Sequence, residues 1–191
     1  MEEFVLFMKK FVAFTDEEWK LAAPFFRRTT YAKGTTILKQ GTTCKMLSFV
    51  EAGAFRQYRT EDIEEYAYDF SFEEDYAVDF KSFLTGSPAT LSISALRDST
   101  IINISKHDLD KVYRICPAFQ EFGRLMIERA FVYDDERVQS LLYDTPEERY
   151  LKLMKRDPHL LAEIPLYSIA SYLGIRPETL SRVRANLAKK K

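Results

Sequence analysis

The C-terminal segment 164–191 constrains the fold of this chain more than any other stretch. Its apolar residues recur at helical spacing in two groups, which predicts two short helices. Between the groups, Gly174 favours the left-handed conformation that ends a helix, and Pro177 suits the first turn of the next helix. This spacing is typical of a helix-turn-helix. The apolar positions are Ile169, Ala170, Leu173, Leu180, Val183 and Leu187.

The polar side of the second helix carries groups that can read DNA. Glu178 can accept a hydrogen bond from a cytosine amino group, and Arg182 can contact guanine O6 and N7 together. The lysines at the end of the chain can neutralise phosphates. The alternative is a surface helix in which Glu178 and Arg182, four residues apart, form an ordinary ion pair. The predicted DNA-binding residues are Arg176, Glu178, Thr179, Ser181, Arg182, Asn186, Lys189 and Lys190.

The charge of the chain is distributed in a way that supports DNA binding by this end. The formal net charge of the whole chain is only -1. From Tyr143 onward, however, ten Lys and Arg stand against six Asp and Glu, whereas residues 1–142 carry 18 against 23. The basic part of the chain is therefore the part with the predicted helix-turn-helix.

The sequence has no feature of an exported or membrane-spanning chain. Its first residues are acidic before a very short apolar run, which is the opposite order to a secretory signal. No stretch is apolar for the roughly 18 residues that a membrane span needs, so we expect a cytoplasmic protein with no membrane partner. Cys44 and Cys116 are too few for a four-thiolate iron–sulfur cluster and form no Cys-x-x-Cys pair. We expect reduced thiols, no metal and no cofactor.

The middle of the chain predicts a β-rich domain. Two short helices are expected first, over 4–14 and 16–26, with Thr15 and Glu18 forming a capping box. Short runs rich in Thr, Ile, Val, Phe and Tyr follow, separated by glycines and polar turns. The last three runs alternate as if one face were buried. The expected strands are 35–39, 46–51, 54–58, 65–72, 91–96 and 100–104.

Helices return after the strands. The pattern predicts a short helix over 108–115 that ends before Cys116-Pro117, and then a long helix over 118–142. A further helix is expected over 147–155. Its inward residues are predicted to be Tyr150, Leu151 and Met154.

The long helix carries two apolar stripes. Two stripes predict two partners, the β-rich domain and the same helix of a second chain, although either stripe can also be ordinary core. The first stripe is Phe119, Phe122, Met126, Ala130 and Tyr133. The second is Ile127, Phe131, Val138 and Leu142.

The start of the β-rich domain resembles a cyclic-nucleotide-binding β-roll. The residues that carry this resemblance are Gly34, Ile37, Gly41, Phe49, Val50, Gly53 and Arg56. Together with the C-terminal segment, they make the chain similar to the Crp/Fnr family of bacterial transcription regulators. The resemblance implies an α+β fold with an N-terminal double-stranded, jelly-roll-like β-roll over 1–117, a dimerisation helix over 118–142 and a helix-turn-helix domain over 143–191. It also implies a wing, which is expected around 162–166.

The same resemblance implies partners for this chain. They are double-stranded DNA with inverted half-sites, a second copy of the chain and RNA polymerase, together with a small-molecule effector of unknown identity, if any. The order Glu178-x-x-Ser181-Arg182 is similar to that of the Fnr-like branch, which implies a TTGA-like half-site.

The nucleotide pocket is where the chain departs from the family pattern. Counting along the sequence places Ala89 at the position of the arginine that holds the cyclic phosphate. A phosphate without that guanidinium loses its main bidentate contact, so we expect that cyclic AMP is not the effector. The residues expected near this degenerate pocket are Glu73, Glu74, Ala89 and Thr90.

Other functions have weaker support in the sequence. Nine carboxylates and no Lys or Arg lie between 61 and 79. This stretch indicates a divalent metal site or an acidic contact surface. The simpler interpretation is a solvated loop and strand face, because no EF-hand spacing is present. The two histidines, His107 and His159, are far apart and no Gly-rich phosphate loop is present, so we do not expect an enzyme. The remaining alternative is a ligand-sensing or protein-binding β-roll whose C-terminal helices serve assembly only.

Overall fold

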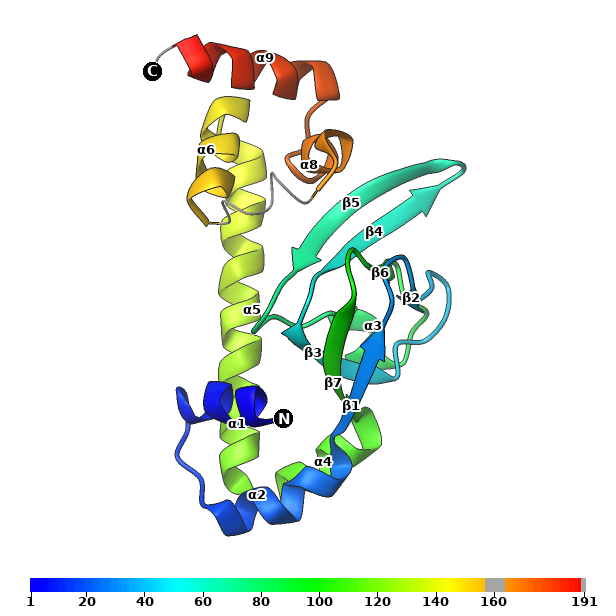
Figure 1. Ribbon diagram of the computed structural model, residues 1–191, viewed down its shortest axis with the longest axis vertical. Helices are drawn as coiled ribbons and strands as arrows, with labels where there is room; N and C mark the ends of the chain where they lie inside the picture. The colour runs from blue at the N-terminus through cyan, green and yellow to red at the C-terminus, as the bar shows by residue number, and fades with distance from the viewer. Residues whose placement is uncertain (157–163, 190–191) are drawn as a thin grey trace.

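The computed structural model describes residues 1–156 and 164–189. It shows a β-roll of two antiparallel sheets beside a long helix, with shorter helices at both ends of that helix (Figure 1). The strand orders are β1-β7-β3 and β2-β6-β4-β5. The predicted α+β fold with an N-terminal β-roll is confirmed. The strands are β1 Arg27–Tyr31, β2 Thr36–Leu38, β3 Met46–Ala52, β4 Phe55–Glu61, β5 Glu64–Ser71, β6 Ser92–Ala95 and β7 Ser99–Ser105.

Most helices begin and end close to where their sequence signals lie, but the first helix, predicted over 4–14, ends at Lys9. Thr15 caps α2 by accepting a hydrogen bond from the Glu18 amide, and the Glu18 carboxylate accepts one from the Thr15 amide, so the predicted capping box is present. Helix α4 stops before Cys116, and Pro117 is the first residue of α5. The helices are α1 Glu2–Lys9, α2 Asp16–Ala22, the 3-10 turn η1 Ala23–Phe25, α3 Phe80–Thr85, α4 Lys106–Ile115, α5 Pro117–Tyr143, α6 Pro146–Arg156, α8 Leu166–Tyr172 and α9 Pro177–Lys189.

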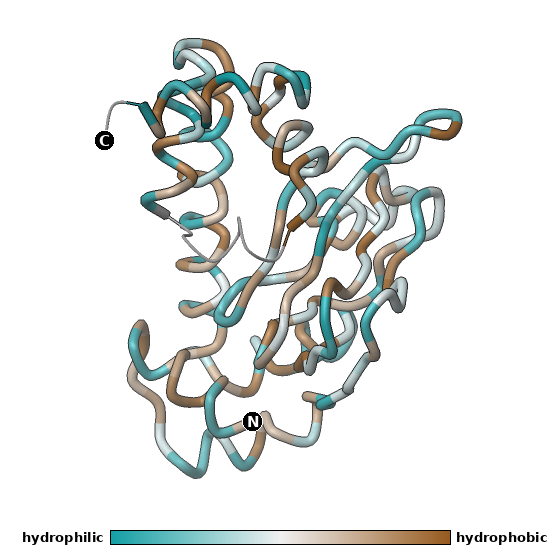
Figure 2. The backbone as a smooth tube through the Cα atoms, turned by 45° about the horizontal axis from the view of Figure 1, so that its top comes forward, coloured by the Kyte–Doolittle hydropathy of each residue, from teal (hydrophilic) through white to brown (hydrophobic). Residues whose placement is uncertain are grey.

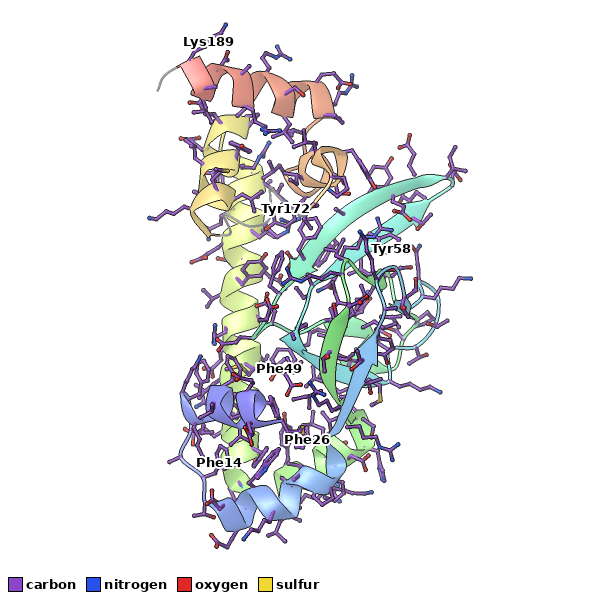
Figure 3. All side chains as sticks on the ribbon, in the orientation of Figure 1. Phe14, Phe26, Phe49, Tyr58, Tyr172 and Lys189 are labelled. Atoms are coloured by element: carbon purple, nitrogen blue, oxygen red, sulfur yellow. The ribbon has the colours of Figure 1, made fainter. Side chains whose placement is uncertain are left out.

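An aromatic cluster joins the N-terminal helices to the roll and to α5. The ring centroid of Phe4 on α1 lies 4.9 Å from that of Phe49 on β3 and 6.4 Å from that of Phe122 on α5. Trp19 on α2 stacks on Phe119 at 6.3 Å. Figure 3 shows Phe49 between the sheet and the helices. The first apolar stripe of α5 is therefore the side of the helix that packs against the roll.

The predicted alternation is wrong for the last two strands, β6 and β7, whereas in β5 the exposed Tyr66 and Tyr68 alternate with the half-buried Ala67 and Asp69. Every residue of β6 is buried, as is every residue of β7 except Ser105. Both strands have a neighbour on each side within their sheet, and their polar side chains are satisfied by neighbouring strands. The hydroxyls of Ser94 and Thr36 lie 2.9 Å apart, and the Asn103 amide oxygen accepts a hydrogen bond of 2.7 Å from Ser48. Hydrogen-bonded polar groups can be buried in this way.

One inward residue of α6 also differs from the prediction. Tyr150 is buried and Met154 is half-buried, as expected, but Leu151 is 46% exposed. Leu153, which is 4% exposed, takes its place against α8 and α9. None of the described helices is long and apolar enough to cross a bilayer.

Candidate nucleic-acid interface and nucleotide pocket

Helices α8 and α9 form the helix-turn-helix that the sequence predicts. The apolar side of α8 is buried, and Gly174 follows it with a φ of 65°. The amide of Ile175 donates to the Ala170 carbonyl, which closes the end of the helix. Pro177 is the first residue of α9. Leu180 and Val183 are buried beneath α9, so the opposite side of this helix faces solvent.

The outer face of α9 presents the predicted base-reading side chains. Helix α9 lies at the end of the molecule far from α1 and α2 (Figure 1). Glu178, Ser181 and Arg182 are exposed, and within the described part of the chain no ion pair joins Glu178 to Arg182. The alternative of an internal ion pair on a surface helix therefore has no support. Arg182 and Asn186 also line an open groove shared with the first turn of α6.

The other predicted DNA-binding residues lie around this face. Arg176 is exposed in the turn, Thr179 is half-buried and Asn186 is exposed. Lys189 is exposed at the end of α9, as Figure 3 shows. Lys190 and Lys191 lie outside the described residues.

The wing is not formed by the described part of its predicted range. Residues 162 and 163 lie outside the described residues, Ile164 is buried in a bend, and Leu166 already belongs to α8.

A contact that the sequence did not predict joins the helix-turn-helix to the roll. The β4–β5 hairpin projects beyond the roll; its outer part is mostly hydrophilic, with a hydrophobic residue, Ile63, at the tip (Figure 2). Near its base, the Ala67 amide donates a 2.8 Å hydrogen bond to the Ser171 hydroxyl of α8. The ring of Phe70 packs 5.6 Å from that of Tyr172, and both belong to the apolar core formed with α6 and α9.

Polar groups of α5 reinforce this junction. The Tyr133 hydroxyl donates a 2.9 Å hydrogen bond to Asp69 on β5 and lies 3.1 Å from the Tyr172 hydroxyl. The Arg137 guanidinium donates to the carbonyls of Tyr68 and Tyr172 at 2.7 and 3.2 Å, and it lies over the Tyr172 ring. Strand β5, helix α5 and helix α8 are therefore connected by hydrogen bonds as well as by apolar packing.

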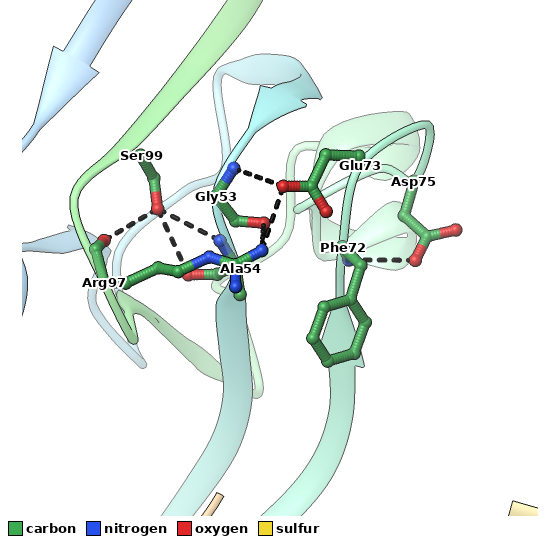
Figure 4. Close-up of polar contacts among 7 residues, drawn as sticks. All are labelled: Gly53, Ala54, Phe72, Glu73, Asp75, Arg97 and Ser99. Carbon is green, nitrogen blue, oxygen red and sulfur yellow. Dashed lines mark hydrogen bonds and ion pairs between the residues drawn. The ribbon is translucent and has the colours of Figure 1, made fainter. Parts of the chain in front are cut away.

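The polar groups expected around the degenerate nucleotide pocket have partners within the chain. One Glu73 oxygen accepts hydrogen bonds from the Gly53 amide at 2.8 Å and from Arg97 at 2.9 Å (Figure 4). Arg97 also donates to the Gly53 carbonyl at 3.2 Å. Burial acts to raise the pKa of Glu73, but the hydrogen bonds from Gly53 and Arg97 outweigh it and the pKa is lowered. Glu73 is thus an ionised group that already has its partners.

A buried carboxylate lies where the phosphate side of the pocket was expected. Ala89 is 3% exposed and is held by backbone hydrogen bonds. The amide and hydroxyl of Thr90 donate to Asp79 at 2.9 and 3.2 Å, and Asp79, which is 4% exposed, also caps α3. Glu74 is paired with Lys10. A cyclic phosphate at this position would meet a negative charge and a buried methyl group in place of a guanidinium.

The acidic stretch between 61 and 79 is spread along the β4–β5 hairpin and the segment after it. Glu65 forms a 2.6 Å ion pair with Arg56, and the carboxylates of Asp69, Glu73 and Asp79 have the separate partners given above. No three His, Cys, Asp or Glu side chains are grouped as metal ligands in residues 1–156 and 164–189. The interpretation as a metal site therefore has no structural support.

The remaining candidate reactive groups lie apart from these sites. Cys44 and Cys116 are buried free thiols, and burial raises the pKa of both. His107 is exposed at the start of α4, and His159 lies outside the described residues.

The second apolar stripe of α5 is uncovered in the single chain. Phe131 is 73% exposed and Leu142 is 68% exposed, and Ile127 and Val138 on the same side are also exposed. In contrast, Phe122 on the first stripe is 5% exposed. The helix therefore separates an inner face packed on its own roll from an outer face that lacks a partner within the described chain.

Known proteins share parts of this sequence pattern and most of this architecture. Residues 28–115 match the model of the cyclic nucleotide-binding domain family. FixK2 from Bradyrhizobium japonicum has a TM-score of 0.72 at 20% identity, covering 86% of this chain and 85% of that chain. A putative Crp/Fnr-family transcriptional regulator from Eubacterium rectale has a TM-score of 0.70 at 15% identity, covering 93% and 85%. No curated protein sequence matches the chain.

These matches place the chain in the class of proteins that join a cyclic-nucleotide-binding-type roll to a helix-turn-helix. The Catabolite Activator Protein of Thermus thermophilus also shares the fold, with a TM-score of 0.58 at 22% identity, covering 93% of this chain and 85% of that chain. Within the class, the chain has the fold of the Crp/Fnr family of transcription regulators. The resemblance stated from the sequence is confirmed at the level of the fold.

Proposed function

We propose that this chain is a homodimeric, sequence-specific DNA-binding regulator of transcription that does not respond to cyclic AMP. The observation that carries this proposal is the outer face of α9. Its Glu178, Ser181 and Arg182 are exposed and unpaired within the described residues, while the opposite side of the helix is buried. A helix that only supported assembly would not need these groups on its free face.

The dimer in this proposal forms through α5. Its outer stripe exposes four large apolar residues on one side of a 27-residue helix, and such a stripe is usually covered by a partner. A two-fold axis along this helix would present one α9 from each chain, which suits inverted half-sites about one helical turn apart. The functional parts are then a sensor roll over 1–117, a dimerisation helix over 118–142 and a DNA-binding domain over 143–191, with RNA polymerase as a further partner.

Base recognition is assigned to two residues one turn apart on α9. Arg182 contacts a guanine with two hydrogen bonds and Glu178 accepts from a cytosine amino group on a neighbouring pair, while Ser181 can donate or accept. Arg176, Thr179, Asn186 and the lysines from Lys189 onward serve the phosphates and the margins of the site.

The decisive experiment measures DNA affinity and sequence preference together. The probe is a duplex with two inverted TTGA half-sites, compared with a duplex in which the guanines are replaced. Arg182→Ala should weaken binding to the first duplex by about 1–3 kcal/mol and remove the preference between the two. Arg184→Ala, an exposed neighbour off the reading face, is the matched control and should weaken both duplexes equally. Unchanged affinity and preference in Arg182→Ala would exclude α9 as the reading helix.

The alternative function, a roll whose C-terminal helices serve assembly only, also has an observation in its favour. Helix α8 packs on β5 of its own roll through Ser171 and Tyr172, so the C-terminal helices do contribute to the structure of a single chain. That alternative predicts weak, salt-sensitive binding of equal affinity to both duplexes. Arg182→Ala would then not change the relative affinity for the two duplexes.

A further inference from the structure

A cavity of about 150 Å³ lies where α5, α6 and α8 meet, well away from the degenerate nucleotide pocket. Three cationic side chains line it, Arg137, Arg149 and Lys152, together with one carboxylate, Glu136. The rest of the lining is mainly apolar and includes Leu153 and the Tyr172 ring. The cavity thus combines an excess of positive charge with apolar walls.

The two arginines of this cavity form no ion pair with a carboxylate in the described part of the chain. Arg149 donates one hydrogen bond, of 3.0 Å, to the Leu141 carbonyl, and its buried Nε has no hydrogen-bond partner among residues 1–156 and 164–189. Arg137 donates to two backbone carbonyls. Lys152, in contrast, forms an ion pair of 2.6 Å with Asp144. A buried N–H without an acceptor is costly, and such groups in native structures usually have a reason.

We propose that this cavity binds a small organic anion, with a carboxylate facing Arg149 and Arg137 and an apolar body between Leu153 and the Tyr172 ring. The anion would supply the acceptor that Arg149 Nε lacks and would balance the excess charge. Its size follows from the volume, because a protein cavity of about 150 Å³ accommodates a molecule such as benzene. The ligand class is therefore a monocarboxylate with about one six-membered ring. This site goes beyond the proposed DNA-binding function and does not depend on it.

The test uses the full chain without DNA and benzoate as the probe. Calorimetric titration should show one benzoate per chain, while benzyl alcohol, which has the same ring but no charge, should bind at least about tenfold more weakly. Arg149→Gln should weaken benzoate binding by about tenfold or more, because the charged hydrogen bond to the carboxylate is lost. Lys155→Gln, an exposed residue of the same helix outside the lining, is the matched control and should leave binding unchanged.

A second variant keeps the test decisive if Arg149→Gln fails to fold. Ser140→Leu leaves all three cations in place and fills part of the cavity, so it should abolish benzoate binding while circular dichroism shows an intact fold. The proposal is overturned if benzoate does not bind the parent chain, if benzyl alcohol binds as tightly, or if folded Ser140→Leu still binds it. Because no DNA is present, benzoate binding remains measurable even if the duplex experiment on Arg182 fails.

Discussion

Gly53 lies in the bend between β3 and β4, next to Ser99 at the start of β7. Its φ is 104°, and a Cβ added there would lie 2.1 Å from the Ser99 hydroxyl oxygen and 2.6 Å from the Ser99 Cα. Gly53→Ala should therefore lower the free energy of unfolding by about 3 kcal/mol, from left-handed strain and overpacking combined. Urea unfolding at neutral pH measures this loss.

Gly34 provides the matched control for this substitution. Its φ is 83°, but an added Cβ would meet no heavy atom within 4 Å. Gly34→Ala should cost only the conformational strain of about 1–2 kcal/mol. Equal losses in the two variants would show that the contact with Ser99 does not limit the packing at Gly53.

A second prediction at this scale concerns the pH dependence of stability. The Glu51 side chain is 6% exposed and is paired with the N-terminal ammonium of Met1 and with Arg28. Burial acts to raise the pKa of Glu51, but its ion pairs outweigh burial and the pKa is lowered. The stabilisation is therefore complete above the unfolded-state pKa of about 4.3 and is lost as the pH falls through the lower folded-state value.

Glu51→Gln tests this directly. It should reduce the free energy of unfolding by about 1 kcal/mol at pH 7, and the difference from the parent should shrink as the pH falls below about 4. Glu17→Gln, an exposed position on α2, serves as the control. A difference that stays constant into acid would mean that the charge of Glu51 does not contribute.

At the scale of elements, the two faces of α5 make separable predictions. Phe131→Glu places a charge on the exposed stripe, so it should convert a dimer of twice 22.3 kDa into a folded monomer, as measured by light scattering. Val132→Glu changes a residue that is also exposed, at 56%, but lies on another side of the helix, and it should leave the dimer intact. A parent chain that is monomeric at micromolar concentration would contradict the assignment.

The inner face should respond differently. Met126 is 9% exposed and packs in the core of the roll, so Met126→Glu should destabilise the fold itself. Loss of the fold in Met126→Glu and loss of the dimer in Phe131→Glu would identify which face of α5 is core and which is the dimer interface. The sequence pattern alone did not distinguish the two faces.

Most elements were predicted from local signals, and the missed ones lacked such signals. Strand β1 reads Arg-Arg-Thr-Thr-Tyr over Arg27–Tyr31 and has no apolar alternation, because it is an edge strand held by pairing with β7. Helix α3 has six residues, which is too short for a periodic pattern. Leu151 and Leu153 could not be ranked from spacing, because the inward direction of α6 is set by α8 and α9.

The helix-turn-helix part of the candidate site was predicted from the sequence, but the contacts between distant segments were not. The helix-turn-helix follows from residues close in sequence, and its Gly174 and Pro177 occupy the expected positions. The contacts of Glu73 with Gly53 and Arg97 join residues about 20 positions apart, and those between β5 and α8 about 100 apart. No local pattern encodes such pairings, and the cavity beside Arg149 depends on three helices at once.

For the whole molecule, the contacts around the degenerate nucleotide pocket predict independence from cyclic AMP. Asp79 and Ala89 occupy the region where a phosphate would need a guanidinium, and Arg97 is already engaged with Glu73. Calorimetry with millimolar cyclic AMP should show no heat beyond dilution, and DNA affinity should be the same with and without it. Micromolar binding would contradict this prediction, and its loss in Arg97→Gln or Arg56→Gln would identify the group that replaces the missing arginine.

The packing of Phe70 from β5 into the core of the helix-turn-helix couples the stability of the β-roll to that of the C-terminal helices. Because this ring contributes to the same apolar cluster as Ile169 and Leu180, the C-terminal helices complete their core with a side chain from the roll. The roll and the C-terminal helices should then unfold together, in one cooperative transition with a single midpoint. Phe70→Ala would separate that transition into two, with the C-terminal helices melting first.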